Sequence, residues 1–78
     1  MTPAEALGLR KGDRIKVRRA TSRRARLAIV TDRPTEVGRY ALVPFAFIRH
    51  AAGTPGGESF SWHEHYAQLP VDRVEREP

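Results

Sequence analysis

The sequence predicts a mainly β protein, a small antiparallel β-barrel of about four to five strands with a short helical turn near its N-terminus. Three observations lead to this prediction. Short segments alternate between apolar and polar residues, turn-forming residues separate them, and 78 residues with 40% apolar composition provide one small core. We therefore expect a single domain over 1–78, with its core in 12–75 and a frayed tail at 75–78.

A helical turn and the first strand open the chain. Residues 3–7 follow the signals of a helix start, a capping threonine, a proline at the first helical position and a capping-box glutamate: Thr2, Pro3 and Glu5. Residues 14–18 alternate strictly between basic and apolar side chains, so we expect a strand with Ile15 and Val17 facing the core. A polar, basic loop follows at 19–26.

Two further strands form the middle of the predicted sheet. Residues 27–31 are apolar and β-branched, and residues 32–38 carry the turn chemistry of a hairpin loop. The next strand, 39–48, has an unusual phase, because two of its large apolar residues fall on each face. We expect a bulge at Val43–Pro44, on an edge or strongly bent strand, that brings all four to the core: Tyr40, Leu42, Phe45 and Phe47.

The last third of the sequence is harder to assign. Residues 51–57 read as a flexible, exposed loop, and the aromatic residues that follow favour a strand over 58–63. Residues 64–68 fit a turn or a short helix. Residues 71–74 fit either a 3₁₀ turn or a short closing strand.

Basic charge is concentrated in the first half of the chain. Residues 1–34 hold ten basic and three acidic side chains, whereas residues 35–78 hold four basic and six acidic ones, for a net charge of +5. Twelve of the fourteen basic residues are arginine, whose planar fork suits phosphate recognition. A GC-rich coding sequence explains that bias equally well. The uneven distribution is therefore the stronger signal, and it predicts a polyanion-facing surface or a partner of complementary charge.

The candidate interface is the first strand with its following loop. We expect its basic side chains to clamp phosphates of nucleic acid: Arg14, Lys16, Arg18, Arg19, Arg23, Arg24 and Arg26. Trp62 and Tyr66 are the candidate base-stacking residues, because their segment is the least certain to be buried. The alternatives are a solvated loop that maintains solubility, and a docking surface for an acidic protein.

Other partners and compartments are constrained by composition. The longest mainly apolar run, Ala41 to Ile48, is far shorter than the ~20 residues of a membrane span, so we expect no membrane partner. The absence of cysteine fits a reducing, cytoplasmic location. A core of this size supplies little stability, so oligomerisation could contribute to it.

The sequence gives little support for catalysis, and we expect a binding module without enzymatic activity, cofactor or metal. It contains no cysteine, no nucleophile elbow and no phosphate-binding glycine loop. His63 and His65 share a face only if their segment is extended, in which case His50 could supply a third ligand.

Two stretches resemble SH3-like barrels of the KOW and Tudor kind. Gly12-Asp13 before the first strand is similar to the turn that enters such barrels, and Trp62 followed by the segment 69–75 is similar to the strands and 3₁₀ turn that close them. Small proteins of this pattern resemble open reading frames of actinobacterial phages and their hosts. The chain departs from the KOW pattern at 20–24, where that pattern has a glycine.

A second, local resemblance involves Gly12-Asp13 and the segment 26–32. This pair looks like the first two strands of MazF/PemK-type endoribonuclease toxins, which also fold as SH3-like barrels. The resemblance implies RNA cleavage, but the catalytic threonine of that family cannot be assigned to a position here. Nucleic-acid binding, docking of an acidic protein and ribonuclease activity therefore remain three hypotheses, in that order.

Overall fold

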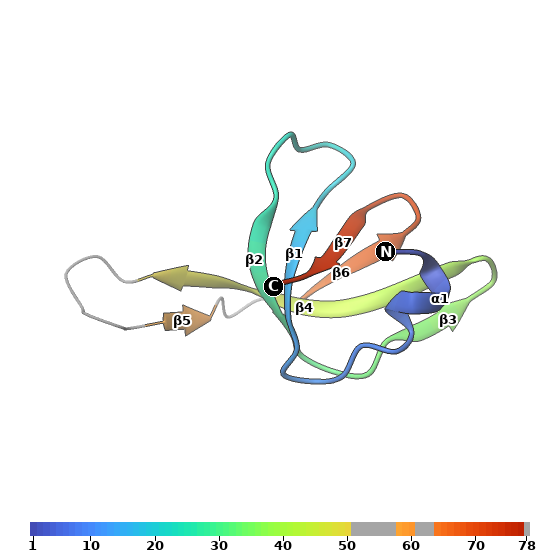
Figure 1. Cartoon of the computed structure of the whole chain (residues 1–78), viewed down its shortest axis with the longest axis horizontal. Coiled ribbons are helices and arrows are strands. Elements are labelled where there is room, and N and C mark those ends of the chain that lie inside the picture. Colours follow the sequence, from blue (N-terminus) through green and yellow to red (C-terminus); the bar gives the residue numbers. More distant parts are fainter. Residues whose placement is uncertain (51–57, 61–63, 78) are drawn as a thin grey trace.

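An antiparallel sheet curls into a half-barrel, with one short helix near the N-terminus (Figure 1). The structure is a computed structural model, and it describes residues 1–50, 58–60 and 64–77. Its elements in chain order are α1 (Pro3–Ala6), β1 (Arg14–Arg18), β2 (Arg26–Val30), β3 (Thr35–Val37), β4 (Tyr40–His50), β5 (Glu58–Phe60), β6 (His65–Leu69) and β7 (Arg73–Arg76). The predicted mainly β fold is confirmed.

The strand order is β3-β4-β2-β1-β7, and β5 and β6 also pair with β4. Every pair is antiparallel. The last strand, β7, returns to pair with the first, β1, which curls the sheet around its core (Figure 1). The closing strand that was one of two predictions for 71–74 is therefore present as β7. The short strand β3 was not predicted, whereas β5 falls within the strand predicted over 58–63.

The helical turn forms as predicted. The Glu5 backbone N–H donates to Thr2 Oγ1 at 3.2 Å, and the Thr2 N–H donates to Glu5 Oε1 at 3.1 Å. These two bonds make a capping box, and the hydrogen bonds from Thr2 lower the pKa of the Glu5 carboxyl. In the part of the chain that the structure describes, α1 is the one α-helix, and its four residues are too few to cross a membrane.

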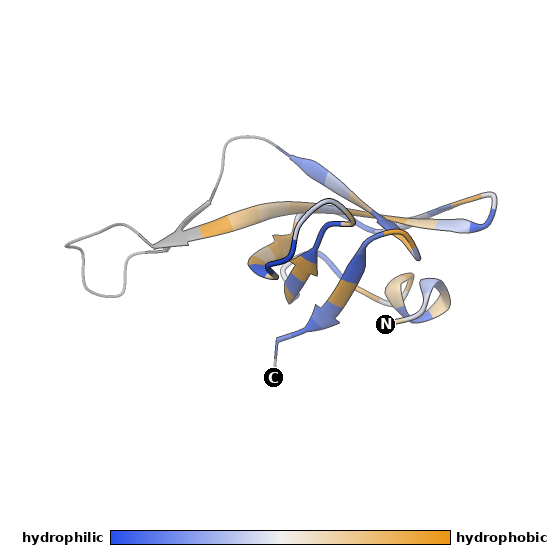
Figure 2. Cartoon of the chain, turned by 90° about the horizontal axis from the view of Figure 1, so that it is seen from above, coloured by the Kyte–Doolittle hydropathy of each residue, from blue (hydrophilic) through white to orange (hydrophobic). Residues whose placement is uncertain are grey.

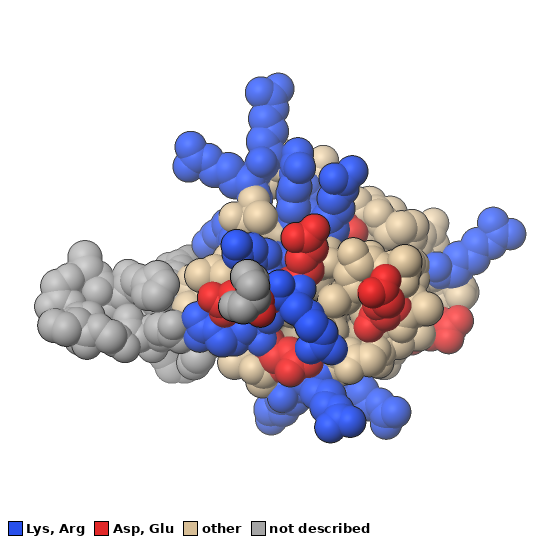
Figure 3. Space-filling model, viewed as in Figure 1, with Lys and Arg blue, Asp and Glu red and all other residues tan. Residues whose placement is uncertain are grey.

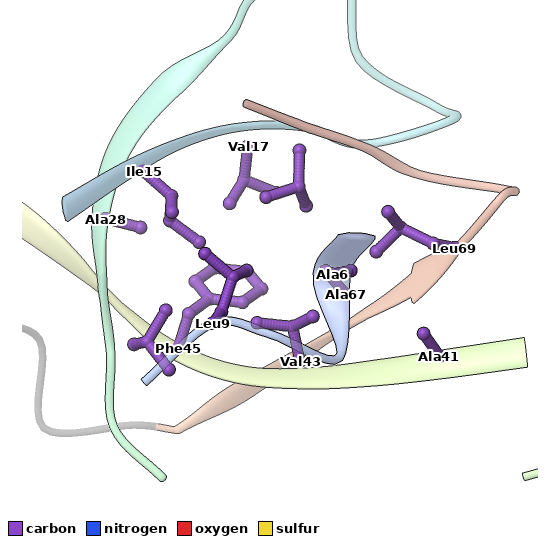
Figure 4. Packing of buried hydrophobic residues seen from close by; sticks show 12 residues of the cluster. Ala6, Leu9, Ile15, Val17, Ala28, Ala41, Val43, Phe45, Ala67 and Leu69 are labelled. Carbon is purple, nitrogen blue, oxygen red and sulfur yellow. The ribbon is translucent and has the colours of Figure 1, made fainter. Parts of the chain in front are cut away.

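The core lies on the concave side of the sheet, and the segment after α1 covers it (Figure 4). Ile15 and Val17 face inward as predicted, and Leu9 is inserted between them and Phe45 with only 2% of its surface exposed. Hydropathy follows the same division, because the short strands carry alternating polar and apolar bands (Figure 2). The buried cluster comprises Ala6, Leu9, Ile15, Val17, Ala28, Val30, Ala41, Val43, Phe45, Ala67, Leu69 and Val74.

The predicted bulge at Val43–Pro44 is wrong. Pairing between β4 and β6 runs without interruption from Ala41 to Phe45, so side chains alternate strictly along β4. The core face consequently carries Ala41, Val43 and Phe45, while Tyr40 lies on the opposite face with 42% of its surface exposed. Leu42, which was also expected in the core, is on that same face and is half-buried.

Strand β4 tolerates Pro44 because the segment opposite it, residues 31–34 between β2 and β3, is not paired as a strand. The Pro44 carbonyl accepts a hydrogen bond from the Thr31 N–H at 3.0 Å, so the proline nitrogen faces the same edge. At that point β2 has ended and β3 has not begun: four residues, 31–34, stand opposite two of β4. The proline therefore lies in a central strand, not an edge strand, without removing a hydrogen bond from a ladder.

Three other predicted segments differ from the structure. Residues 32–38 contain β3, which leaves a two-residue turn at Gly38–Arg39, where Gly38 has φ +60. Residues 64–68 are neither a turn nor a helix, because β6 spans His65–Leu69. The tail expected to fray is paired through Arg76, and the Glu77 N–H donates to the Arg14 carbonyl at 3.1 Å. The predicted loop at 51–57 lies outside the described residues.

The turn at Gly12–Asp13 connects the start of β1 to its neighbours. The Asp13 carboxylate accepts from the Arg10 N–H at 2.9 Å and from Arg76 Nη1 at 3.0 Å. Its backbone carbonyl accepts from the Val30 N–H at 2.9 Å, and Gly12 adopts φ +94. The Arg10 N–H, with a smaller contribution from Arg76, lowers the pKa of Asp13 below its ordinary value of 3.8.

Leu9→Ala should lower the free energy of unfolding by about 2–5 kcal/mol, because it leaves a cavity in the middle of the core. Leu7→Ala, two residues away and only partly buried, is the matched control and should cost clearly less. Thermal denaturation followed by circular dichroism measures both. Equal losses in the two variants would contradict the position assigned to Leu9.

Asp13→Asn should destabilise the protein more at neutral pH than in acid. Since the folded-state pKa of Asp13 is lowered, its ionised carboxylate stabilises the fold above about pH 4, and that contribution is lost as the pH falls through the folded pKa. The difference in Tm between wild type and variant should therefore shrink as the pH falls from about 6 to about 2. Glu36→Gln on the exposed strand β3 controls for the loss of one surface charge. A difference that stays constant with pH would refute the assignment.

Candidate nucleic-acid interface

The predicted basic residues do not form one uniform patch. Lys and Arg side chains gather over the β1–β2 loop at the top of Figure 3, and others lie at the opposite end of the molecule. The seven predicted residues divide into those that contact other parts of the fold and those that face solvent without an ion pair to a described carboxylate.

Arg14 belongs to the first group. Its Nε lies 2.5 Å from Glu77 Oε2, and its backbone carbonyl accepts from the Glu77 N–H. It begins β1, at the end of that strand far from the β1–β2 loop. Arg14 therefore ties the C-terminal segment to β1 and is not part of a surface around the loop.

Arg19 is also held in place by the fold. Its Nη1 donates to the Tyr66 carbonyl at 3.1 Å and lies 4.0 Å from Asp72 Oδ2. Its guanidinium carbon is 5.4 Å from the centre of the Phe45 ring. This arginine connects the end of β1 to β6 and to the turn before β7.

Arg26, at the start of β2, covers an aromatic cluster. Its guanidinium carbon lies 3.9 Å from the centre of the Phe47 ring. Phe47 meets Phe45 edge to face at 5.0 Å, and the His65 ring is 5.1 Å from Phe47 and 5.6 Å from Phe45. Arg26 is exposed, whereas Phe47 and His65 are half-buried.

Lys16 and Arg18 project from the convex face of β1. The register of β1 with β7 places Arg73 opposite Arg18 and Glu75 opposite Lys16. Two arginines thus face outward side by side on neighbouring strands. Within the described part of the chain, no carboxylate lies within 4.0 Å of Arg18 or Arg73.

Two shallow hollows flank this arginine pair. One, of about 220 Å³, is lined by Arg18, Arg19, Ala20, Ser22, Val71 and Arg73. The other, of about 180 Å³, is lined by Lys16, Arg18, Ala25, Arg73 and Glu75. Because both hollows share Arg18 and Arg73, the two arginines form the centre of a continuous basic strip. We call this strip, Lys16, Arg18 and Arg73 with Ser22, the arginine strip.

Arg23 and Arg24 extend the arginine strip into the loop. Both are exposed, and the loop has a compact turn in which the Ser22 N–H donates to the Arg19 carbonyl at 3.0 Å. The Arg24 N–H lies 3.3 Å from Ser22 Oγ, and Ser22 Oγ also lies 3.3 Å from the Arg24 carbonyl. The loop therefore presents its two arginines at its outer end.

Asp72 positions the loop beside the turn that precedes β7. Its side chain is almost fully buried, with 7% of the residue exposed. Oδ1 accepts from the Ala20 N–H at 3.0 Å, and Oδ2 accepts from the Gln68 N–H at 2.9 Å. This single carboxylate joins the loop, β6 and the turn, and its two sequence neighbours, Val71 and Arg73, line the larger of the two hollows.

Sequence reasoning missed Arg73 and Asp72. Arg73 is isolated in sequence from the basic cluster, and only the pairing of β7 with β1 brings it opposite Arg18. The signal that could have found it was the alternation of 71–74 as a closing strand, which places residues 72 and 74 inward and residue 73 outward.

The structure describes some, but not all, of the residues predicted to stack on bases or to bind a metal. Tyr66 lies on β6 with 53% of its surface exposed, and its hydroxyl is 3.5 Å from Glu64 Oε2. Trp62 and His63 lie outside the described residues. Among the residues that are described, no group of three metal-ligating side chains comes together. The His65 ring instead stacks on Phe45 and lies tilted against Phe47.

Comparison of the chain with protein-family models, with curated proteins and with solved structures finds no match.

Asp72→Asn should destabilise the protein by about 1–3 kcal/mol, because an amide group replaces one of two acceptor oxygens at a buried site. The backbone N–H groups of Ala20 and Gln68 should exchange with solvent faster, which NMR hydrogen exchange measures residue by residue. Asp32→Asn, at an exposed position, is the matched control. Unchanged exchange at Ala20 would show that the carboxylate does not hold the loop.

Proposed function

We propose that the chain is a small, non-enzymatic binding module that contacts nucleic-acid phosphates through the arginine strip and the adjoining loop. Each arginine would act as a phosphate clamp and not as a reader of bases. Binding would consequently depend on charge and little on sequence. The proposed setting is the cytoplasm.

The observation that carries this proposal is the pair Arg18 and Arg73. Like charges directly opposite each other on neighbouring strands destabilise a sheet. Neither arginine forms an ion pair with a described carboxylate. An anion that binds between the two side chains would therefore relieve their repulsion and stabilise the fold. A phosphate oxygen pair matches the arginine fork, and such charge-assisted hydrogen bonds are among the stronger ones.

The surroundings of the pair also favour phosphate. Ser22 lines one of the two hollows and could donate its hydroxyl to a phosphate oxygen. Exposed Arg23 and Arg24 add positive charge on the loop, whereas Lys16 on the other side stands opposite Glu75. The hollows are too small and shallow to enclose a drug-sized ligand, which needs about 300 Å³ or more. The sugar-phosphate backbone of a nucleic acid, which would run across the surface, fits these shallow hollows better than a small molecule that must be enclosed.

We also propose that the chain is an SH3-like barrel, as the sequence resemblance implies, and the strand order supports this proposal. A first strand paired with the second and the last, and a turn at 70–72 before that last strand, is the arrangement that the resemblance implies. The Gly12–Asp13 turn lies at the entrance of β1, as in the KOW and Tudor pattern. The ribonuclease hypothesis rests on the sequence resemblance alone.

The double variant Arg18→Gln/Arg73→Gln should weaken nucleic-acid binding and reduce its salt dependence. Each lost phosphate contact lowers the slope of log K against log salt by about 0.7–0.9, so the pair should lower it by about 1.4–1.8. Fluorescence anisotropy with labelled oligonucleotides over a salt series measures this slope. Arg39→Gln, in the β3–β4 turn, removes an exposed arginine elsewhere and should leave the slope nearly unchanged.

An unchanged slope in the double variant would overturn the proposed role of the pair. If wild-type protein binds no nucleic acid at low salt but a nuclease-treated pull-down recovers one acidic protein, the docking hypothesis replaces this proposal.

A further inference from the structure

We infer that Arg26, Phe47 and His65 form a subsite on which a nucleobase stacks, so that the ligand of the arginine strip is single-stranded nucleic acid. This inference rests on the proposed function and adds to it the kind of nucleic acid. It uses side chains that the phosphate contacts leave unexplained.

Arg26 lies against an aromatic ring and also faces solvent. Its guanidinium carbon lies over the Phe47 ring, 3.9 Å from the ring centre, and the residue is exposed. It makes no ion pair with a described carboxylate. Bases in single-stranded nucleic acid stack on guanidinium planes as they do on aromatic rings. The exposed guanidinium of Arg26 therefore offers a stacking surface beside Phe47.

The aromatic cluster beside Arg26 is held in position before a ligand arrives. Phe47 packs edge to face on Phe45, which is completely buried, and the half-buried His65 ring lies between 5 and 6 Å from both. Strand pairing fixes the backbone of all three, since Phe45 stands opposite His65 and Phe47 opposite Ala28. A base would therefore meet a rigid surface and would order few side chains on binding.

The subsite lies at the same end of the β1–β2 hairpin as Arg18 of the arginine strip. In the β1–β2 hairpin, Arg26 stands opposite Val17, the residue before Arg18. Side chains alternate along a strand, so Arg26 points to the concave side and Arg18 to the convex side at the same end of the hairpin. A nucleic-acid strand that passes around the β1–β2 loop at this end of the hairpin would contact the arginine strip on the convex side and Arg26 on the concave side.

Only a single strand satisfies this arrangement. In a duplex the bases are paired and stacked, and reaching one requires unstacking at a cost of a few kcal/mol. A single strand turns its bases away from its backbone freely, and each stacked base adds affinity with little dependence on sequence.

The test separates bases from phosphates by comparing two polyanions. Labelled oligo(dT) of 12 nucleotides carries both, whereas inorganic polyphosphate of equal charge carries phosphates alone. Wild-type protein should bind oligo(dT) at least tenfold more tightly than polyphosphate, and more tightly than a duplex of the same length, in anisotropy competition assays. Arg26→Lys keeps the charge but removes the planar group.

Arg26→Lys should weaken oligo(dT) binding by about tenfold and change polyphosphate binding less than twofold. Arg39→Lys is the matched control and should change neither. Phe47→Leu keeps an apolar side chain but removes the ring, and should also act on oligo(dT) alone; its Tm confirms that it folds.

Equal binding of oligo(dT) and polyphosphate by wild type, or equal losses for both in Arg26→Lys, would overturn the stacking subsite while leaving the phosphate contacts in place. Tighter binding of the duplex than of the single strand would overturn it as well. Failure of wild type to bind either polymer at low salt would instead overturn the proposed function.

Discussion

The antiparallel pairing of β7 with β1 is the constraint on which both the fold and the candidate interface depend. It sets Val17 opposite Val74 on the core side and Arg18 opposite Arg73 on the outer side. Since side chains alternate with a period of two, a slip of one residue would bury Arg73 and expose Val74. The hydrophobic core thus fixes the register that brings the two arginines together, and the charge repulsion between them is a consequence of closing the sheet.

Asp72 is the second element of that closure. Its buried carboxylate accepts N–H groups from the β1–β2 loop and from β6, and it stands next to Arg19, which in turn reaches the Tyr66 carbonyl. The turn before β7, the basic loop and β6 are therefore one connected unit. This connection gives the loop a defined shape although most of its side chains face solvent, and it explains why the larger hollow lies where the loop meets β7.

The sequence predicted correctly those features that depend on residues close together in the chain. The capping box at Thr2 and the strict alternation of 14–18 are both found in the structure, because neighbouring residues determine them. The strand predicted over 39–48 is found as β4, but the bulge predicted within it and the turn or helix predicted for 64–68 are wrong, because both depend on pairing partners distant in sequence. Pro44 suggested a bulge in its own strand, but the opposing chain between β2 and β3 supplies the irregularity. Arg73 entered the candidate site for the same reason: only long-range register places it.

From the sequence alone, a GC-rich coding composition and phosphate recognition explain the excess of arginine over lysine equally well. In the structure, the arginines differ in whether their position requires the guanidinium group. Arg19 donates to a carbonyl while its guanidinium lies over Phe45, and Arg26 stacks on Phe47, so both use the planar group that lysine lacks. Arg23 and Arg24 are exposed and contribute charge that lysine would supply as well. Coding composition is thus a sufficient explanation at the loop tip and an insufficient one at the two arginines on phenylalanine rings. Those two positions, where geometry and not charge selects the residue, are the ones that give the basic surface its chemical character.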